Sequence, residues 1–262
     1  MTATRGQGYD PFPPNPTMFK IPVSVQLWSV REHIAKDFAG TVAKLAGFGF
    51  QGVETAGYGN LDAAGAAAAL KATGLQCSGM HVGIDALRGN LTNLAVDAHR
   101  LGSRHIICPW MPKELFANAG SAAEFGRELG AIGARLRGYG LHLHYHNHDG
   151  ELATDLGQSA FEHLLDAAPP AHLGAEVDVY WVKFAGHDPA HFLRRLGTRC
   201  RLVHLKDSHE LGTGPVDFPA LFAAIDSVGA AEWQIIEVEH YNHDPLESVR
   251  LSLEQLKKWG RA

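Results

Sequence analysis

Acidic and imidazole side chains close four successive apolar runs in the second half of the chain. Glu151 follows the first of these runs, Asp178 ends the second, His204 lies near the end of the third and Glu237 follows the fourth. If the four run ends meet, their carboxylates repel one another, which is costly unless a cation or protons neutralise the charge. We therefore predict that these four residues bind one divalent metal ion.

The predicted ligand set contains three carboxylates and one imidazole. Such an oxygen-rich set suits Mn²⁺ or Mg²⁺, and it is also compatible with Co²⁺ or Zn²⁺. The set contains no cysteine, which argues against a structural zinc site. Glu239 is a second option for the last ligand, because Glu237 and Glu239 are two residues apart and point to the same side of a strand.

The residues from Val23 onward alternate between short β-prone runs and longer stretches of helical periodicity. This pattern predicts parallel strands that are joined by crossover helices. The expected strands are Val23–Trp28, Gly52–Thr55, Gln76–His81, His105–Cys108, Leu141–His146, Leu173–Asp178, Leu202–Lys206 and Trp233–Val238. The expected helices are Phe38–Ala46, Leu61–Thr73, Leu91–Leu101, Ala122–Tyr139, Ser159–Ala167, Pro189–Leu196, Phe218–Val228 and Pro245–Trp259.

Eight strand–helix units of about 33 residues each suit a (β/α)8 barrel, a fold that takes about 250 residues. The main alternative is an open doubly wound sheet with a glycine-rich phosphate loop after its first strand, but Ser29–His33 stands at that place. In a barrel the C-terminal ends of the strands form the active face, so the predicted metal ligands meet there. We expect one barrel domain over residues 21–262, preceded by a flexible Pro- and Gly-rich arm over residues 1–20.

The composition argues against several classes of partner. The 262 residues include 23 Lys+Arg and 28 Asp+Glu, for a net charge of −5 without long runs of either sign, so we expect no nucleic-acid surface. Cys77, Cys108 and Cys200 lack CxxC spacing and predict reduced thiols in a cytoplasmic protein. We expect neither a signal peptide nor a membrane span. The oligomeric state stays open; a homodimer is one option, because barrels of this kind often pair.

Five segments, taken in order, form a specific combination: Val25–Arg31, Tyr145–His148 with Glu151, Asp178 with Trp181, His204–Asp207, and Glu237. Through them the chain, from Val23 to Trp259, resembles the sugar phosphate isomerase/epimerase group of xylose isomerase-like TIM barrels. Relatives include hydroxypyruvate isomerases, ketose 3-epimerases, inosose dehydratases and enzymes of 3-keto glycosides. The resemblance implies the same four metal ligands, and substrate contacts from His81, His146, Trp181 and Lys206.

The expected reaction is metal-dependent isomerisation or epimerisation of a sugar, keto sugar or inosose. Two substrate oxygens would chelate the metal, whose Lewis acidity acidifies the neighbouring C–H. Glu151 and Glu237 would remove and return the proton from opposite sides, and Lys206 would stabilise the oxyanion. With a β-leaving group the same intermediate eliminates, so a lyase of the inosose dehydratase or 3-keto glycoside type is the alternative. For Lys206, a surface salt bridge with Asp207 is an equal alternative.

The other candidate contacts have structural alternatives. Glu54, which closes the second expected strand, either contacts substrate or forms a salt bridge at the barrel mouth. His81 and His146 either bind hydroxyls or donate structural hydrogen bonds, and Trp181 either covers a sugar ring or packs in the core. No cluster of Arg and Lys marks a phosphate site, which favours an unphosphorylated substrate. A nuclease of the AP endonuclease type and a non-catalytic sugar-binding barrel are further alternatives, and the net charge of −5 argues against the nuclease.

Overall fold

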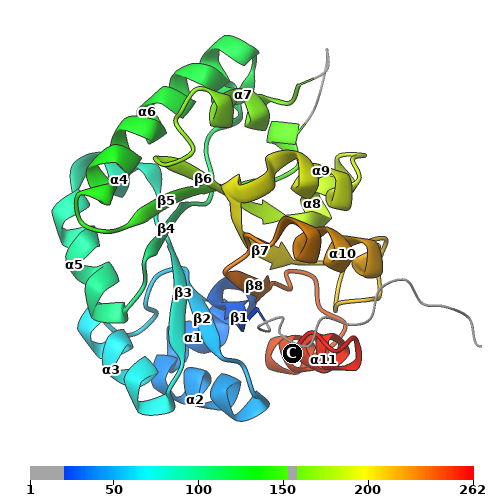
Figure 1. Cartoon of the computed structure of the whole chain (residues 1–262). Helices are drawn as coiled ribbons and strands as arrows, with labels where there is room; N and C mark the ends of the chain where they lie inside the picture. The colour runs from blue at the N-terminus through cyan, green and yellow to red at the C-terminus, as the bar shows by residue number, and fades with distance from the viewer. Residues whose placement is uncertain (1–20, 153–157) are drawn as a thin grey trace, which may run out of the picture.

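Eight parallel strands close into a barrel in sequence order in the computed structural model of the chain, which describes residues 21–152 and 158–262 (Figure 1). Pairing of β1 with β8 completes the closure, with Val25 opposite Ile236. The strands are β1 Val23–Gln26, β2 Gly52–Thr55, β3 Gln76–His81, β4 His105–Cys108, β5 His142–His146, β6 Leu173–Asp178, β7 Cys200–Leu205 and β8 Trp233–Ile236. The predicted (β/α)8 barrel is therefore confirmed.

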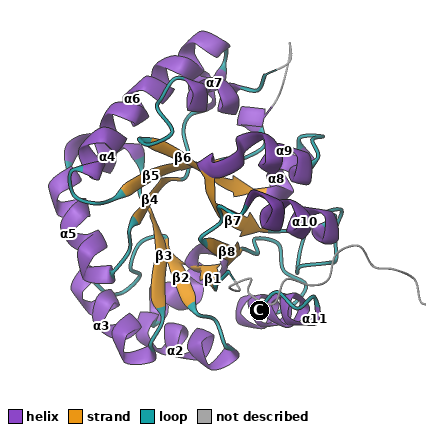
Figure 2. Ribbon diagram, viewed as in Figure 1, coloured by secondary structure: helices purple, strands orange, loops and turns teal. Residues whose placement is uncertain are grey.

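Helices surround the strands on the outside of the barrel (Figure 2). The α-helices are α1 Arg31–Lys36, α2 Phe38–Phe48, α3 Ala63–Thr73, α4 Ile84–Gly89, α5 Leu91–Leu101, α6 Ala119–Arg137, α7 Ala160–Asp166, α8 Val179–Phe184, α9 Pro189–Leu196, α10 Phe218–Val228 and α11 Pro245–Lys258. The 3₁₀ helices are η1 Leu27–Val30, η2 Lys113–Phe116, η3 Gly150–Leu152 and η4 Gly197–Arg199. None of the helices in the described ranges is both long enough and apolar enough to cross a bilayer.

Every expected strand and helix is present, and the largest shift is at the start of α6, which begins at Ala119 instead of Ala122. The elements that were not predicted are short: α1, α4 and α8, together with the 3₁₀ turns. The first three lie in the connections that follow β1, β3 and β6, and they therefore shape the C-terminal face of the barrel. The expected N-terminal arm, residues 1–20, lies outside the described residues.

Aspartate and glycine mark many helix ends. Asp62 begins α3, and its side chain accepts a hydrogen bond from the Gly65 backbone N–H, which satisfies a donor that the helix leaves free. Asp188 begins α9 in the same way, with Pro189 in the first turn. The same helix α3 ends at Gly74, whose φ of 77° lies in the left-handed region that glycine adopts without strain. These local signals explain why the helix bounds follow the sequence closely.

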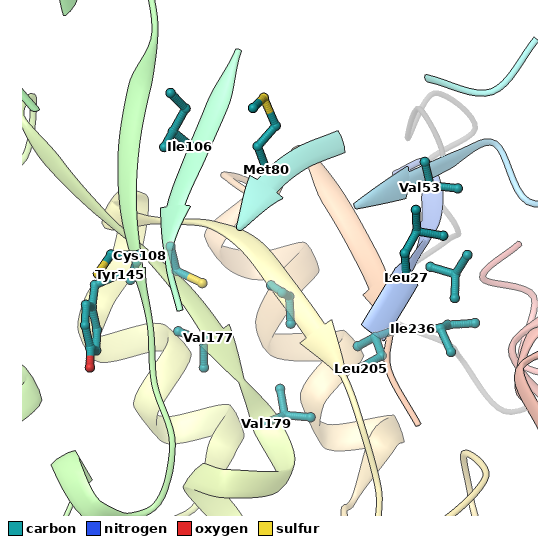
Figure 3. Close-up of a cluster of buried hydrophobic side chains, with 14 of the residues drawn as sticks. Leu27, Val53, Met80, Ile106, Cys108, Tyr145, Val177, Val179, Leu205 and Ile236 are labelled. Atoms are coloured by element: carbon teal, nitrogen blue, oxygen red, sulfur yellow. The ribbon is translucent and has the colours of Figure 1, made fainter. Parts of the chain in front are cut away.

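Buried apolar side chains form two clusters on the two sides of the barrel wall. The larger cluster lies between strands and helices, and Figure 3 shows part of it, including Val53 and Val177. Successive residues of a strand point to opposite sides of the sheet. The strand residues next to those that face the helices therefore point into the barrel. A separate interior cluster consists of Ile107, Leu202, Trp233 and Ile235. Interior positions nearer the C-terminal strand ends are polar, among them Glu54, Glu176 and His204.

Close packing of α6 against the chain before β6 depends on a glycine. A Cβ atom at Gly133 would overlap the backbone carbonyl oxygen of His172. We expect Gly133→Ala to lower the free energy of unfolding by about 1–3 kcal/mol, as overpacking does. The matched control is Gly47→Ala in α2, where a Cβ meets open space and alanine should raise stability by about 0.5–1 kcal/mol. Urea unfolding measures both variants, and a stabilised Gly133→Ala protein would contradict the expectation.

Candidate metal centre

Strand register brings four polar residues to the C-terminal mouth of the barrel. Asp178 of β6 lies opposite His204 of β7, so both side chains enter the barrel at one level. His146 ends β5 on the neighbouring side of β6. Glu237 directly follows β8, and its backbone N–H donates to the Leu205 carbonyl 3.1 Å away, which extends the ladder by one residue. The sheet therefore sets the spacing of these side chains.

The possible ligand atoms of His146, Asp178, His204 and Glu237 lie within 4.8 Å of one another, and all four residues are buried. Three of the four were predicted as metal ligands. A second, overlapping group exchanges Asp178 and Glu237 for His81 and Glu176. The group at the mouth fits a hard cation better, because it has two carboxylates and the second group has one; Asp178 and Glu176 each keep one oxygen without a hydrogen-bond partner among the described residues.

Two of the four residues carry a buried polar atom that has no hydrogen-bond partner among the described residues. Asp178 Oδ1 accepts hydrogen bonds from the Tyr180 and Trp181 backbone N–H groups at 2.9 and 3.1 Å, and so caps α8, but its Oδ2 has no partner. His146 Nδ1 also lacks a hydrogen bond, although it lies 3.1 Å from Glu176 Oε2. Buried polar atoms are normally satisfied, so these two atoms are available to a ligand that the chain itself does not supply. The residues present therefore fit a metal ion.

Carboxylates in the barrel interior hold the imidazole of His204 in place. His204 Nε2 lies 2.7 Å from Glu54 Oε2, and Glu54 also accepts a hydrogen bond from Gln26 Nε2 at 2.8 Å. The other ring nitrogen, Nδ1, faces Glu237 Oε2 at 3.2 Å. A histidine that donates one ring N–H to a carboxylate presents its other nitrogen to a metal, which is the usual arrangement around metal-binding histidines.

The interior charges shift the pKa values of this cluster in opposite directions. Burial and the charge of Glu54 raise the pKa of Glu176 to about 7. Burial acts on Glu54 in the same direction, but the neighbouring His81 and His204 hold the pKa of Glu54 well below its usual value. Burial and the charge of His204 lower the pKa of His146 well below its usual value. The pKa of His204 shifts the other way: burial lowers it, but Glu176 and Glu54 raise it well above its usual value. In the chain alone His146 is therefore neutral, whereas a metal would have to displace a proton from His204.

Lys206 is buried among the acidic residues of the mouth and is only 1% exposed. Its Nζ donates to Glu239 Oε2 at 2.6 Å and lies 3.3 Å from Glu237 Oε2 and 3.6 Å from Asp178 Oδ2. Burial would lower the pKa of Lys206, but these carboxylates raise it, so the ammonium stays charged. The alternative, a surface salt bridge with Asp207, is wrong: the Asp207 carboxylate accepts backbone N–H groups of the following loop.

The structure does not bring Glu151 into either group of possible ligands. Its two carboxylate oxygens accept hydrogen bonds from the Tyr145 hydroxyl at 2.8 Å and from the His148 backbone N–H at 3.1 Å. Tyr145 precedes His146 in β5, so its side chain points out of the barrel toward the helices and holds Glu151 there. His146, and not Glu151, clusters with Asp178, His204 and Glu237.

Two cavities open at the mouth beside the cluster. The main cavity has a volume of about 420 Å³, and its lining includes Trp28, His81, His146, Glu237 and Glu239. The second has a volume of about 230 Å³, and its lining includes Phe116, Glu151 and Trp181. Trp110 and His148 line both cavities, so the two spaces adjoin.

The predicted substrate contacts fall in different places. His81 and His146 line the main cavity, and Trp181 lines the second one. Glu54 is 0% exposed and contacts His204 and His81 instead of the cavity.

Several residues of the site were missed at the level of sequence. Glu176 could have been found, because it stands two residues before Asp178 and therefore points to the same side of β6. Trp28 was assigned to the first strand, although it forms part of η1 and lines the main cavity. Trp110 lies in the connection after β4, where periodicity carries no signal. His148, two residues beyond β5, belongs to the Tyr145–His148 segment of the family resemblance but was not predicted as a substrate contact.

Comparisons with known proteins identify the family and the fold. A family model described as xylose isomerase-like TIM barrel matches residues 42–259. Among solved structures, the chain is similar to a sugar phosphate isomerase/epimerase from Parabacteroides distasonis, with a TM-score of 0.82 and 20% identity over 90% of this chain and 98% of that chain. It is also similar to an AP endonuclease, family 2, from Brucella melitensis, with a TM-score of 0.73 and 16% identity over 91% of this chain and 98% of that chain.

A third similar structure is a D-allulose 3-epimerase from Methylomonas sp., with a TM-score of 0.70 and 15% identity over 91% of this chain and 98% of that chain. A search of curated proteins found no match. At these identities the structural likeness shows the shared fold, and the family model shows the family.

Proposed function

The chain belongs to the xylose isomerase-like TIM barrel family, and on that premise we propose that it is a divalent-metal-dependent isomerase or epimerase of a sugar, keto sugar or inosose. The family assignment confirms the resemblance seen in the sequence. The observation that carries the proposal is the convergence of four buried side chains, His146, Asp178, His204 and Glu237, with an orphaned oxygen on Asp178.

These four residues would hold the metal ion. His146 replaces Glu151 in the proposed set, which then has two imidazoles and two carboxylates. Manganese suits this mixture of nitrogen and oxygen donors, and Mg²⁺, Co²⁺ and Zn²⁺ are the other candidates. Glu54 and Glu176 lie behind the two histidines and would orient their rings.

The lining of the main cavity includes a carboxylate that lies outside the proposed ligand set and can transfer a proton. When bound, the metal would supply Lewis acidity that acidifies the C–H beside a substrate carbonyl. Glu237 and Glu239 both line this cavity, and because Glu237 would be a ligand, we assign proton removal and return to Glu239. Lys206 donates to Glu239 and contacts Glu237, so its fixed positive charge would stabilise negative charge that develops between them.

The cavity lining suits a sugar. Trp28 and Trp110 present exposed aromatic faces on which the apolar side of a sugar ring can stack. His81 and His148 add polar groups that can bind hydroxyls. The substrate would be a small molecule, and the three free, buried cysteines fit a reducing cytoplasm.

Deuterium exchange tests the proposed reaction. Manganese-loaded protein would be incubated in D2O with a panel of keto sugars and inososes, and the products followed by NMR. We expect deuterium on carbon without loss of water. An unsaturated or diketo product would reassign the protein as a lyase, and no uptake with any member of the panel would contradict both assignments.

Removing the charge behind His204 should weaken metal binding without removing a ligand. We expect Glu54→Gln to lower the affinity for Mn²⁺ by about 10–100-fold, because carboxylates that orient metal-bound histidines have effects of that size. Isothermal titration calorimetry measures the change. The control is Glu232→Gln: this residue pairs with His105 instead of a proposed ligand, and it should leave the affinity unchanged. Equal affinities for the two variants would contradict the positioning role.

A further inference from the structure

The second cavity adjoins the main one but is built differently. Its walls include Met111, Phe116 and Trp181, and it shares Trp110 and His148 with the main cavity. Resting on the proposed function, we propose that the substrate is a glycoside with a planar aromatic substituent: the sugar ring occupies the main cavity and the aromatic group occupies the second.

Neighbouring ring side chains connect the group of proposed metal ligands with the second cavity. The His148 ring lies 5.0 Å from the His146 ring and 5.8 Å from the Trp181 ring, measured between centroids. A ligand that spans both cavities passes Trp110, which is 61% exposed. Phe116 is held by contacts with Phe125 and Tyr145 at 6.3 and 6.0 Å. The wall is therefore backed by the core, and flat aromatic surfaces of this kind favour a flat aromatic ligand.

Two buried polar atoms in this cavity wall have no hydrogen-bond partner within the described part of the chain: Trp181 Nε1 and His148 Nδ1. An indole N–H can only donate, so it calls for an acceptor on the ligand. The oxygen that links a sugar to an aromatic ring, or a hydroxyl on that ring, supplies such an acceptor. The wall combines Trp110, Phe116 and Trp181 with polar and charged residues, and ligand sites typically combine apolar and aromatic surface with a few polar groups that orient the ligand.

The residues that line the second cavity argue against two other substrates: a lone monosaccharide, and a glycoside whose second unit is also a sugar. A lone monosaccharide at the metal would leave the aromatic wall exposed to water. A second sugar would bring several hydroxyls, but the buried carboxylate available to them, Glu151, already accepts hydrogen bonds on both oxygens from Tyr145 and His148. Lys113 and Asp149 also line this cavity, but both are exposed at its edge. An aromatic ring needs few hydrogen bonds and buries the most apolar surface here.

Paired glucosides test the proposal. Phenyl and methyl glucosides, in both anomeric forms, would be titrated into the manganese-loaded protein, with saturation-transfer NMR to map the bound protons. We expect the phenyl glucoside of one anomer to bind at least about tenfold more tightly than its methyl counterpart, because the ring buries apolar area. The strongest saturation transfer should fall on the phenyl protons.

Two variants test whether the preference for the phenyl glucoside arises in the second cavity. Trp181→Phe keeps a ring but removes the Nε1–H, and it should reduce the phenyl-to-methyl preference by about threefold to tenfold. Trp28→Ala, which changes the main cavity, should weaken both glucosides alike. Equal binding of the two glucosides by the unmodified protein, or an unchanged preference in Trp181→Phe, would overturn the proposal. If deuterium exchange on free keto sugars persists in that case, the proposed function stands and the aromatic subsite alone fails.

Discussion

Asp178→Asn is expected to lower the affinity for Mn²⁺ by at least about 100-fold, beyond the range seen when only an orienting residue is lost. Asparagine can still accept the backbone hydrogen bonds that Asp178 Oδ1 receives from Tyr180 and Trp181, so the start of α8 is preserved. What it replaces is the orphaned Oδ2, which becomes an amide nitrogen that cannot bind a cation. Calorimetry or manganese electron paramagnetic resonance measures the loss.

Asp188→Asn is the matched control for this change. Asp188 begins α9 with the same pattern, accepting backbone hydrogen bonds from Ala190 and His191, and it is exposed and belongs to neither group of possible ligands. We expect this variant to bind Mn²⁺ as the unmodified protein does. Circular dichroism would show that both variants remain folded. Retention of full manganese affinity by Asp178→Asn would place the ion elsewhere and remove the basis of the proposed function.

Glu239→Gln is expected to slow deuterium exchange at the substrate carbon by about 10²–10⁴-fold, which is the usual contribution of a positioned general base. Its affinity for Mn²⁺ should stay within about threefold of the unmodified value, because Glu239 is not among the four clustered ligands. Exchange rates come from NMR at saturating metal, so a binding defect cannot account for the result.

Glu237→Gln distinguishes metal binding from proton transfer. It removes a proposed ligand two residues away on the same side of the chain, and it should lose metal affinity and exchange together. If Glu239→Gln instead exchanges at the full rate, proton transfer belongs to another group. Glu151→Gln is the next variant to test, since Glu151 borders the second cavity and was, with Glu237, one of the two bases expected from the sequence.

The barrel and three of the proposed ligands could be predicted because they lie on or directly beside strands. An alternation of period two tells which residues share a face, and a polar residue that closes an apolar run therefore faces the mouth. Asp178 and His204 follow this rule and lie opposite each other in the sheet. Glu237 follows it one residue beyond β8.

Glu151 shows where such reasoning stops. Four residues separate it from the end of β5, and the chain turns there through η3. Its position depends on a hydrogen bond from Tyr145, whose side chain faces the helices. Local periodicity does not encode a contact of this kind. The same holds for Lys206, whose partners come from β6 and from the chain after β8 and are brought together only by closure of the barrel.

The two oxygens of the Asp178 carboxylate make different contacts. One oxygen accepts a hydrogen bond from the backbone N–H of Trp181 at the start of α8, and the other faces the remaining proposed metal ligands. The Trp181 ring in turn forms part of the wall of the second cavity. A substitution that removes both oxygens would therefore affect the proposed metal site and the wall of the second cavity together, whereas asparagine, which keeps the oxygen that caps α8, would affect the metal site alone.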